Sequence, residues 1–144
     1  MNEAILVALV GIEAIKAVIS RKLISLDRDI VNYNVGKYGT AFGLTYIVVL
    51  GPTLEELGFR IMPWLFFHSL TAVGIFTVIW WLLHLGNLKY VRAGYAVIAM
   101  YMVAVGLGGI NYVLSLTVSP ILPFIIHIIN NAYSVVLVYV KRNE

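Results

Sequence analysis

Apolar residues gather in five long runs, which short polar or glycine- and proline-containing segments separate. The runs cover about residues 3–20, 38–67, 70–85, 93–114 and 119–140. A transmembrane helix needs about 20 predominantly apolar residues, so runs of this length are typical of membrane spans. The pattern therefore predicts an all-α fold, a polytopic transmembrane helical bundle with about five spans.

The composition also indicates a membrane protein. Of the 144 residues, 61% are hydrophobic and 12% are charged, whereas soluble domains contain about 45–50% apolar and about 25% charged residues. The absence of cysteine excludes a disulfide framework and a thiolate nucleophile. The amino terminus lacks the basic region and cleavage site of a signal peptide. We therefore expect residues 1–144 to form a single integral-membrane domain, in a prokaryotic plasma membrane because no targeting sequence is seen.

The net charge of +3 does not indicate a nucleic-acid partner, because the basic residues stand at the ends of the apolar runs. They lie in three segments, 21–37, 89–92 and 141–142. In a five-span bundle these segments share one side, so the positive-inside rule predicts an amino terminus outside and a carboxyl terminus in the cytoplasm. The polar segment 21–37 is expected to be a loop that can include a short surface helix.

Two features interrupt the apolar runs. Glu13 and Lys16 lie three residues apart in the first run, where they face the same side of a helix and are expected to pair. In the second run, Gly51-Pro52 removes a backbone donor, which predicts a kink and frees a carbonyl one turn earlier. A further bend or the end of this helix is expected near Pro63.

Glu55, Glu56 and Arg60 follow the first of these prolines, and they are the only charged residues between Lys37 and Lys89. An ionised side chain in a membrane costs about 2.5–3.5 kcal/mol on insertion scales, so these three need partners, water or a function. Glu56 and Arg60 are spaced for a helical ion pair. Glu55 points about 100° away and lacks such a neighbour, so we expect it to titrate and to act as a general base.

Two histidines and an asparagine lie in other runs. His84 lies one turn after Trp80, whose ring is expected to shield the imidazole from lipid, and His127 shares a helix face with Asn131. Together with Glu55, these polar side chains can polarise water and stabilise an oxyanion. Three different helices would therefore contribute to one site.

The order of these motifs resembles a known family. Glu-Glu-x-x-x-Arg at 55–60, aromatic-x-x-x-His at 80–84 and His-x-x-x-Asn at 127–131 are similar to the CPBP (Abi-like) family of intramembrane proteases, which includes CAAX prenyl proteases and bacteriocin-processing enzymes. The resemblance covers about residues 40–140, the expected catalytic core. The third histidine, His68, matches no motif and is expected at the membrane interface.

The resemblance implies a helical intramembrane endopeptidase of the glutamate type. Its partners would be the lipid bilayer and a peptide or protein substrate, prenylated in some members of the family. The resemblance further implies that Glu55 and His84 activate the attacking water, and that His127 and Asn131 form an oxyanion hole.

The resemblance also implies that Glu56 and Arg60 hold the motif helix in place. No cofactor is expected, but the motifs leave metal dependence open. If the protein depends on zinc, Glu55, His84 and His127 are the ligands, because two histidines and one glutamate form a known catalytic zinc set.

Two other functions stay open at this point. One is a non-enzymatic immunity or scaffold protein of the same fold, which would bind a peptide or a partner protein in the same cavity. The other is a small proton-coupled transporter, because intramembrane glutamate and histidine also mark ion paths.

The relative depth of the two motif histidines is also open. By the helical rise, His84 lies about 21 Å along a helix that starts at Leu70, and His127 lies about 12 Å along a helix that starts at Ser119. For the two imidazoles to meet, either the first helix starts nearer Gly74 or the two helices are staggered.

Overall fold

The structure is a computed structural model that describes residues 3–91 and 93–141. Regular structure in these residues is helical, with no strand, which confirms the predicted all-α class. The helices are α1 (Glu3–Lys22), α2 (Ile24–Tyr38), α3 (Thr40–Thr45), α4 (Gly51–Glu56), α5 (Met62–Phe67), α6 (Leu70–Leu83), α7 (Tyr95–Leu116) and α8 (Leu122–Val140). The other helical segments are two π-turns, Tyr46–Leu50 and Leu57–Ile61, and a 3-10 helix, His84–Tyr90.

Long apolar helices make the chain an integral membrane protein. Three segments of the described chain are long and apolar enough to cross a bilayer: Leu70–Lys89, Tyr95–Leu116 and Leu122–Val140. The α1 helix and the long helix built from α3, α4 and α5 carry internal charges. The total of about five spans and the orientation with the amino terminus outside therefore stay predictions.

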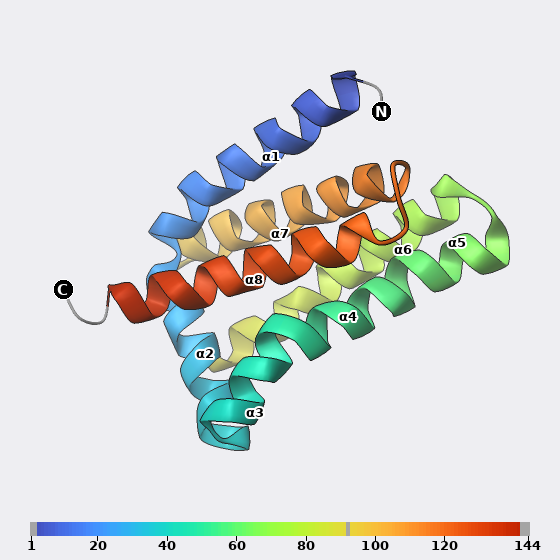
Figure 1. Ribbon diagram of the computed structural model, residues 1–144. Helices are drawn as coiled ribbons and strands as arrows, with labels where there is room; N and C mark the ends of the chain where they lie inside the picture. The colour runs from blue at the N-terminus through green and yellow to red at the C-terminus, as the bar shows by residue number, and fades with distance from the viewer. Residues whose placement is uncertain (1–2, 92, 142–144) are drawn as a thin grey trace.

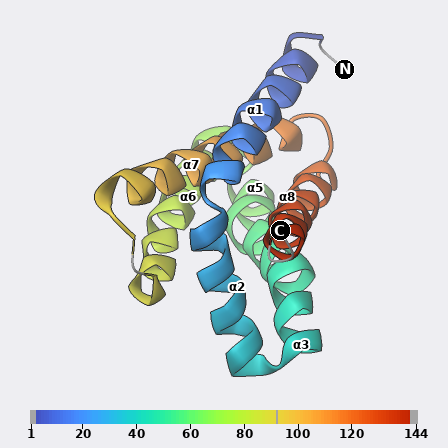
Figure 2. The same cartoon turned by 90° about the vertical axis from the view of Figure 1, so that its left-hand side faces the viewer.

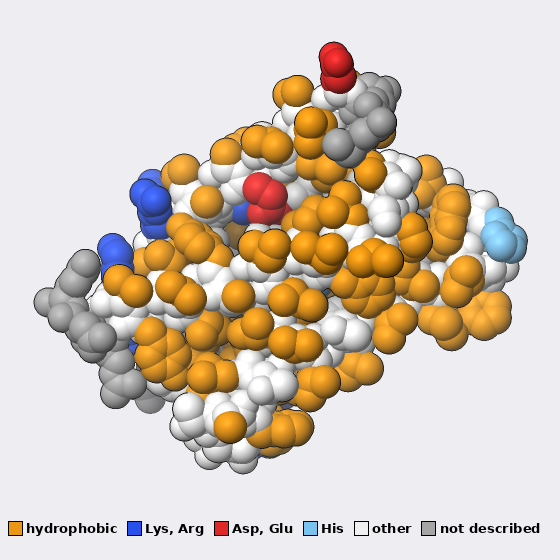
Figure 3. Space-filling view, viewed as in Figure 1, with side chains coloured by type: hydrophobic (Ala, Val, Ile, Leu, Met, Phe, Trp, Pro, Cys, Tyr) orange, Lys and Arg blue, Asp and Glu red, His pale blue; other side chains and the backbone are white. Residues whose placement is uncertain are grey.

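Successive long helices alternate in direction. In Figure 1, α1, α6 and α8 run one way, whereas the α3–α5 helix and α7 run the other way. Figure 3 shows lysine and arginine side chains near the end of the molecule that carries the carboxyl terminus, and apolar side chains over most of this face. Large apolar side chains such as Val7, Phe66 and Ile129 stay 60–72% exposed, as expected for a surface that faces lipid.

The segment 21–37 is not the predicted loop. Residues Ile24–Tyr38 form α2, a helix of 15 residues, because apolar side chains at helical spacing give it a buried face. Leu26 and Val31 on this face are 1% and 4% exposed, and Leu26 packs in a cluster with Tyr101 of α7. In Figure 2 α2 stands beside α8 and α3, and it packs on both. It therefore walls part of the interior of the molecule.

The long helix over residues 40–67 stays continuous through both of its prolines. A π-turn ends two residues before each of Pro52 and Pro63. In such a turn each N–H donates to the carbonyl five residues back, as Gly51 does to Tyr46. The wider turn accommodates the proline ring, so the predicted kink and bend take the form of π-bulges.

A glycine brings α6 and α7 into close contact near the centre of the bundle. A Cβ at Gly109 would lie 2.9 Å from the Thr77 side chain and 3.3 Å from the Trp80 ring. Only a residue without a side chain permits this approach. The contact holds Trp80 in the interior, where it is 3% exposed.

Candidate active site

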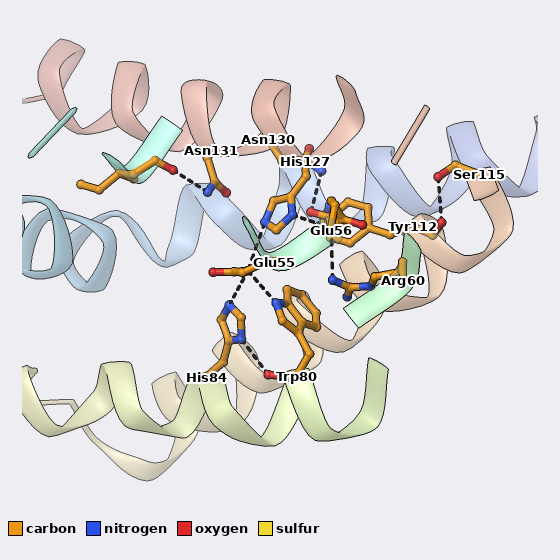
Figure 4. A network of polar contacts seen from close by, with 12 residues as sticks. Glu55, Glu56, Arg60, Trp80, His84, Tyr112, Ser115, His127, Asn130 and Asn131 are labelled. Carbon is orange, nitrogen blue, oxygen red and sulfur yellow. Dashed lines mark hydrogen bonds and ion pairs between the residues drawn. The ribbon is translucent and has the colours of Figure 1, made fainter. Parts of the chain in front are cut away.

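Three side-chain nitrogen atoms from other helices lie close to one carboxylate oxygen. Glu55 Oε2 accepts a hydrogen bond from Trp80 Nε1 at 2.5 Å. The same oxygen lies 3.8 Å from Nε2 of His84 and 3.8 Å from Nε2 of His127 (Figure 4). The structure thus brings together Glu55 of α4, His84 at the start of the 3-10 helix and His127 of α8.

The hydrogen bonds of the two imidazoles determine which nitrogen faces Glu55. Nδ1 of His84 lies 2.9 Å from the backbone carbonyl of Trp80, and Nδ1 of His127 lies 2.7 Å from Oε1 of Glu56. Carbonyl and carboxylate oxygens only accept, so both Nδ1 atoms carry the proton. In the neutral imidazoles both Nε2 atoms are therefore acceptors that point at the Glu55 carboxylate.

The charges of this cluster do not cancel without an additional proton. Glu55 and Glu56 contribute two negative charges and Arg60 contributes one positive charge. With both histidines neutral, one negative charge is left over in a surrounding of low dielectric. The Glu55 carboxylate, which lines the cavity, is the one whose charge no cation of this cluster offsets.

Glu56 and Arg60 form the ion pair that their spacing predicted. Both side chains are 0% exposed, and Arg60 Nη1 lies 3.1 Å from Glu56 Oε1. The guanidinium also stacks over the Trp80 ring at 4.0 Å from its centroid. Because the same Glu56 oxygen accepts from His127, this buried pair orients the imidazole as well as the helix.

One expectation about neighbouring side chains was wrong and another was incomplete. Glu55 is not without a partner, because the indole of Trp80 reaches its carboxylate from α6. Trp80 does more than shield His84: its ring packs edge-on against the imidazole at 4.3 Å, but its N–H is used on Glu55. Residue spacing along one helix cannot show this contact, because the indole reaches Glu55 from a different helix.

A missing proline N–H positions Asn131. The π-turn aligns the Ile47 carbonyl with Pro52, five residues on, which has no N–H to donate. Asn131 Nδ2 donates to this carbonyl at 2.9 Å instead. The carbonyl predicted to be freed by the proline is thus used to fix an amide from α8, whose second N–H stays available.

A cavity of about 400 Å³ adjoins these groups. Glu55, His84, His127 and Asn131 all line it, and α1, α2 and α7 supply the rest of its wall. The Glu55 side chain is 33% exposed, whereas those of His127 and Glu56 are 5% and 0% exposed. Glu55 is therefore the accessible carboxylate of the pair.

A second polar network, which the motifs did not predict, is centred on α1. The predicted Glu13–Lys16 pair is confirmed at 3.1 Å, but Glu13 Oε1 also accepts from Asn130 Nδ2 at 3.3 Å and from Asn111 Nδ2. Asn130 further donates to the Tyr112 hydroxyl at 3.3 Å. The available signal was the presence of two amides within apolar runs, where polar side chains need partners.

Tyr112 connects this network to the site. Its ring stacks on the His127 imidazole, with centroids 4.5 Å apart and an interplanar angle of 19°. The ammonium of Lys16 lies 5.3 Å from the centroid of the same ring. His127 is therefore held by Glu56 at one edge and by Tyr112 on one face.

Helix stagger explains how the two histidines meet. α6 begins at Leu70 and α8 at Leu122, so His84 follows 14 residues of its helix whereas His127 lies in the second turn of its own. His68 takes no part in the site: it terminates α5 in a left-handed conformation with φ of 46°. Its predicted interfacial position stays a prediction.

The zinc alternative was tested against the geometry. Among the described residues no group of three or more His, Asp or Glu side chains is arranged to hold a metal ion. The Glu55 oxygen that faces both imidazoles already accepts a short hydrogen bond from Trp80. Metal dependence stays open, and the ligands would again be Glu55, His84 and His127.

Helices thus enclose a polar site inside an integral membrane protein. A family model described as Type II CAAX prenyl endopeptidase Rce1-like matches residues 37–133. The chain belongs to this Rce1-like family, which confirms the resemblance to the CAAX proteases. The match includes every predicted site residue, but it leaves out α1 and nearly all of α2. Neither a curated protein nor a solved structure gives a significant match.

Proposed function

We propose that this protein is an intramembrane endopeptidase of the glutamate type, which hydrolyses a peptide bond of a membrane-associated or lipidated peptide. The observation that carries the proposal is the convergence of two imidazole Nε2 atoms on one oxygen of Glu55, each at 3.8 Å. Three acceptors around one point suit a water molecule whose proton is to be removed. The proposed catalytic core is residues 40–140, in a prokaryotic plasma membrane.

In the proposed reaction, Glu55 and His84 activate water. The water oxygen attacks the carbonyl carbon of the scissile peptide bond while its proton passes to the Glu55–His84 pair. A tetrahedral intermediate results. When the C–N bond breaks, the same pair returns the proton to the leaving amine, so that one water is consumed and the site regains its starting charge.

His127 and Asn131 stabilise the oxyanion of this intermediate. His127 donates from Nε2 when its imidazole is protonated, and the Glu56 carboxylate at 2.7 Å from Nδ1 favours that state. Asn131 donates through the N–H that the Ile47 carbonyl leaves free. The buried Glu56–Arg60 pair positions these donors without touching the substrate.

The decisive experiment uses purified protein in detergent or vesicles and an internally quenched peptide library. The library holds prenylated and unprenylated peptides that end in Cys-aliphatic-aliphatic-X. Glu55→Gln preserves size and an acceptor for Trp80 but removes the base, so turnover should fall about 10²- to 10⁴-fold. His84→Ala and His127→Ala should give comparable losses.

The third histidine offers a matched control. His68→Asn removes an imidazole at an exposed turn outside the site, and asparagine tolerates the left-handed conformation there. This variant should keep the turnover of the wild type. Equal turnover in the wild type and the Glu55 and histidine variants, or no turnover of any peptide, would refute the proposal.

The proposed mechanism needs no metal, so chelation should leave turnover unchanged. Loss of activity on dialysis against a chelator, with recovery on adding zinc and one metal ion per chain by elemental analysis, would instead assign Glu55, His84 and His127 as ligands.

A further inference from the structure

Asp27 brings a carboxyl group to a wall of the cavity other than the one that carries Glu55. It lies in the first turn of α2 and lines the same 400 Å³ cavity. The Ser134 hydroxyl of α8 donates a hydrogen bond to it. The side chain is largely buried but accessible from the cavity, so a molecule in the cavity can reach it.

Asp27 differs from Glu13, the other carboxylate on the cavity wall outside the candidate site, because no cation compensates it. Glu56 pairs with Arg60 and Glu13 pairs with Lys16. Within the described residues, no ion pair is formed by Asp27. A carboxylate held away from bulk water without a cation is costly, and such groups commonly serve in binding or catalysis.

The charge balance of the cavity leads to the same point. The Glu13–Lys16 pair is neutral, and Glu55 is contacted by the Trp80 N–H and by two imidazoles. The charges left on the cavity wall outside the candidate site are Asp27 and Lys37, and Lys37 is an exposed residue whose ammonium lies over the rings of Tyr33 and Tyr38. This part of the inner wall therefore holds one negative charge that a cationic ligand can neutralise.

A purely structural role would not require the charge. Burial raises the pKa of Asp27 to about 6, against the lowering effect of the Ser134 hydroxyl. The ionised form is thus disfavoured in the folded protein, yet it still predominates at pH 7.5. An asparagine would keep the hydrogen bond to Ser134 and the link between α2 and α8 without this cost.

We propose that Asp27 binds a positively charged nitrogen of the peptide substrate, a lysine or arginine side chain, while the scissile bond lies at Glu55. The inference rests on the proposed function, since it names the substrate class of the same cavity. α2 lies almost wholly outside the family-matched residues, so this selectivity would be a property that this chain adds to the common catalytic core.

A binding experiment separates this inference from catalysis. Fluorescent, amino-terminally acetylated prenylated peptides carry lysine or uncharged norleucine at one position, scanned through the residues beside the prenylated cysteine. They are titrated against Glu55→Gln protein, and the acetyl group excludes binding through a free amino terminus. We expect about tenfold tighter binding of the lysine peptide at one or two positions. Equal affinity at every position would overturn the inference.

Substitution of Asp27 tests the residue itself. In Glu55→Gln protein that also carries Asp27→Asn, the lysine preference should fall to within about twofold. Glu55→Gln with Ser134→Ala is the matched control: it removes the hydrogen bond but keeps the carboxylate, so the preference should persist. A preference that survives Asp27→Asn, or that Ser134→Ala abolishes equally, would contradict the inference.

The turnover ratio of the two peptides gives a second readout in otherwise wild-type protein. A misfolded or generally weakened variant lowers turnover of both peptides and leaves their ratio unchanged, whereas loss of the Asp27 charge lowers the ratio. If no peptide is cleaved but the binding preference holds, the proposed function fails and the binding inference stands. If peptides are cleaved but show no lysine preference, the proposed function stands and the binding inference fails.

The preference should also depend on pH. Asp27 is ionised above its pKa of about 6 and neutral below it, so the lysine preference should be full near pH 7.5 and largely lost near pH 5. Other titratable groups share the cavity: Glu13 and Lys16 of α1, Lys37 of α2, Glu55 of α4, His84, Tyr101 and Tyr112 of α7, His127 of α8 and further tyrosines of its wall. Their protonation acts on both peptides alike unless they contact the lysine, and Asp27→Asn should remove the pH dependence of the ratio.

Discussion

Two glutamates each gather several donors, but they do so in different surroundings. Glu56 is 0% exposed and joins Arg60 to His127 inside the family-matched region. Glu13 is 31% exposed, joins Lys16 to two amides, and lies on α1 outside that region. The comparison indicates a sealed centre, the Glu56–Arg60 pair, behind the proposed catalytic groups, and an outer polar layer, which includes Asp27 of α2, that faces the cavity.

Breaking the sealed centre should have the largest effect on stability. Arg60→Met leaves Glu56 buried without its cation, so the free energy of unfolding should fall by about 3–5 kcal/mol. Thermal unfolding in detergent measures this loss.

A double variant serves as the control for this experiment. Arg60→Met with Glu56→Gln removes both charges and should recover much of the lost stability, though not the proposed activity, because an amide oxygen lacks the negative charge that favours a protonated His127. If the single variant is as stable as the wild type, the Glu56–Arg60 ion pair does not stabilise the fold in the way expected.

The outer layer should tolerate a comparable change better. Glu13→Gln keeps an oxygen for Asn111 and Asn130 but loses the ion pair to Lys16, so we expect a loss of about 1–2 kcal/mol. The same unfolding assay measures it, and Glu3→Gln near the start of α1 is a control for removing a negative charge from that helix. A loss as large as that of Arg60→Met would abolish the distinction between the two networks.

Asp27 allows a prediction with a defined sign. Its pKa is raised from 3.8 to about 6 by folding, so its contribution to stability is fully present below about pH 4 and is lost as the pH rises through 6. Asp27→Asn should therefore match the wild type near pH 4 and exceed it by about 2–5 °C in Tm at pH 7.5. A Tm difference that does not change with pH would contradict the burial of this charge.

Salt should have the smallest effect and should act only on the outer layer. Screening reaches the partly exposed Glu13–Lys16 pair but not the sealed Glu56–Arg60 pair. The destabilisation caused by Glu13→Gln should therefore shrink between low and high salt, by about 0.5 kcal/mol, while that of Arg60→Met stays constant. Unfolding at two salt concentrations checks this, and equal salt dependence of both variants would be the contrary result.

Local chemistry along the chain was enough to identify several parts of this protein. Runs of about 20 apolar residues form helices in a bilayer. The four-residue spacing of Glu56 and Arg60 places both side chains on one face of one helix, so both features follow from the amino-acid sequence alone. The cost of charges among apolar residues likewise marked Glu55, His84 and His127 as candidates for a common site.

Only the tertiary structure decided which groups meet across helices. The Trp80 indole on Glu55, the Asn131 amide on the Ile47 carbonyl and the two amides on Glu13 all join residues far apart in the sequence. Each depends on helix stagger, on the π-turn before Pro52 or on the close approach at Gly109, which arise from packing several helices at once. Periodicity determines the face on which a side chain lies, but the depth and the neighbour that this face meets are set by the other helices.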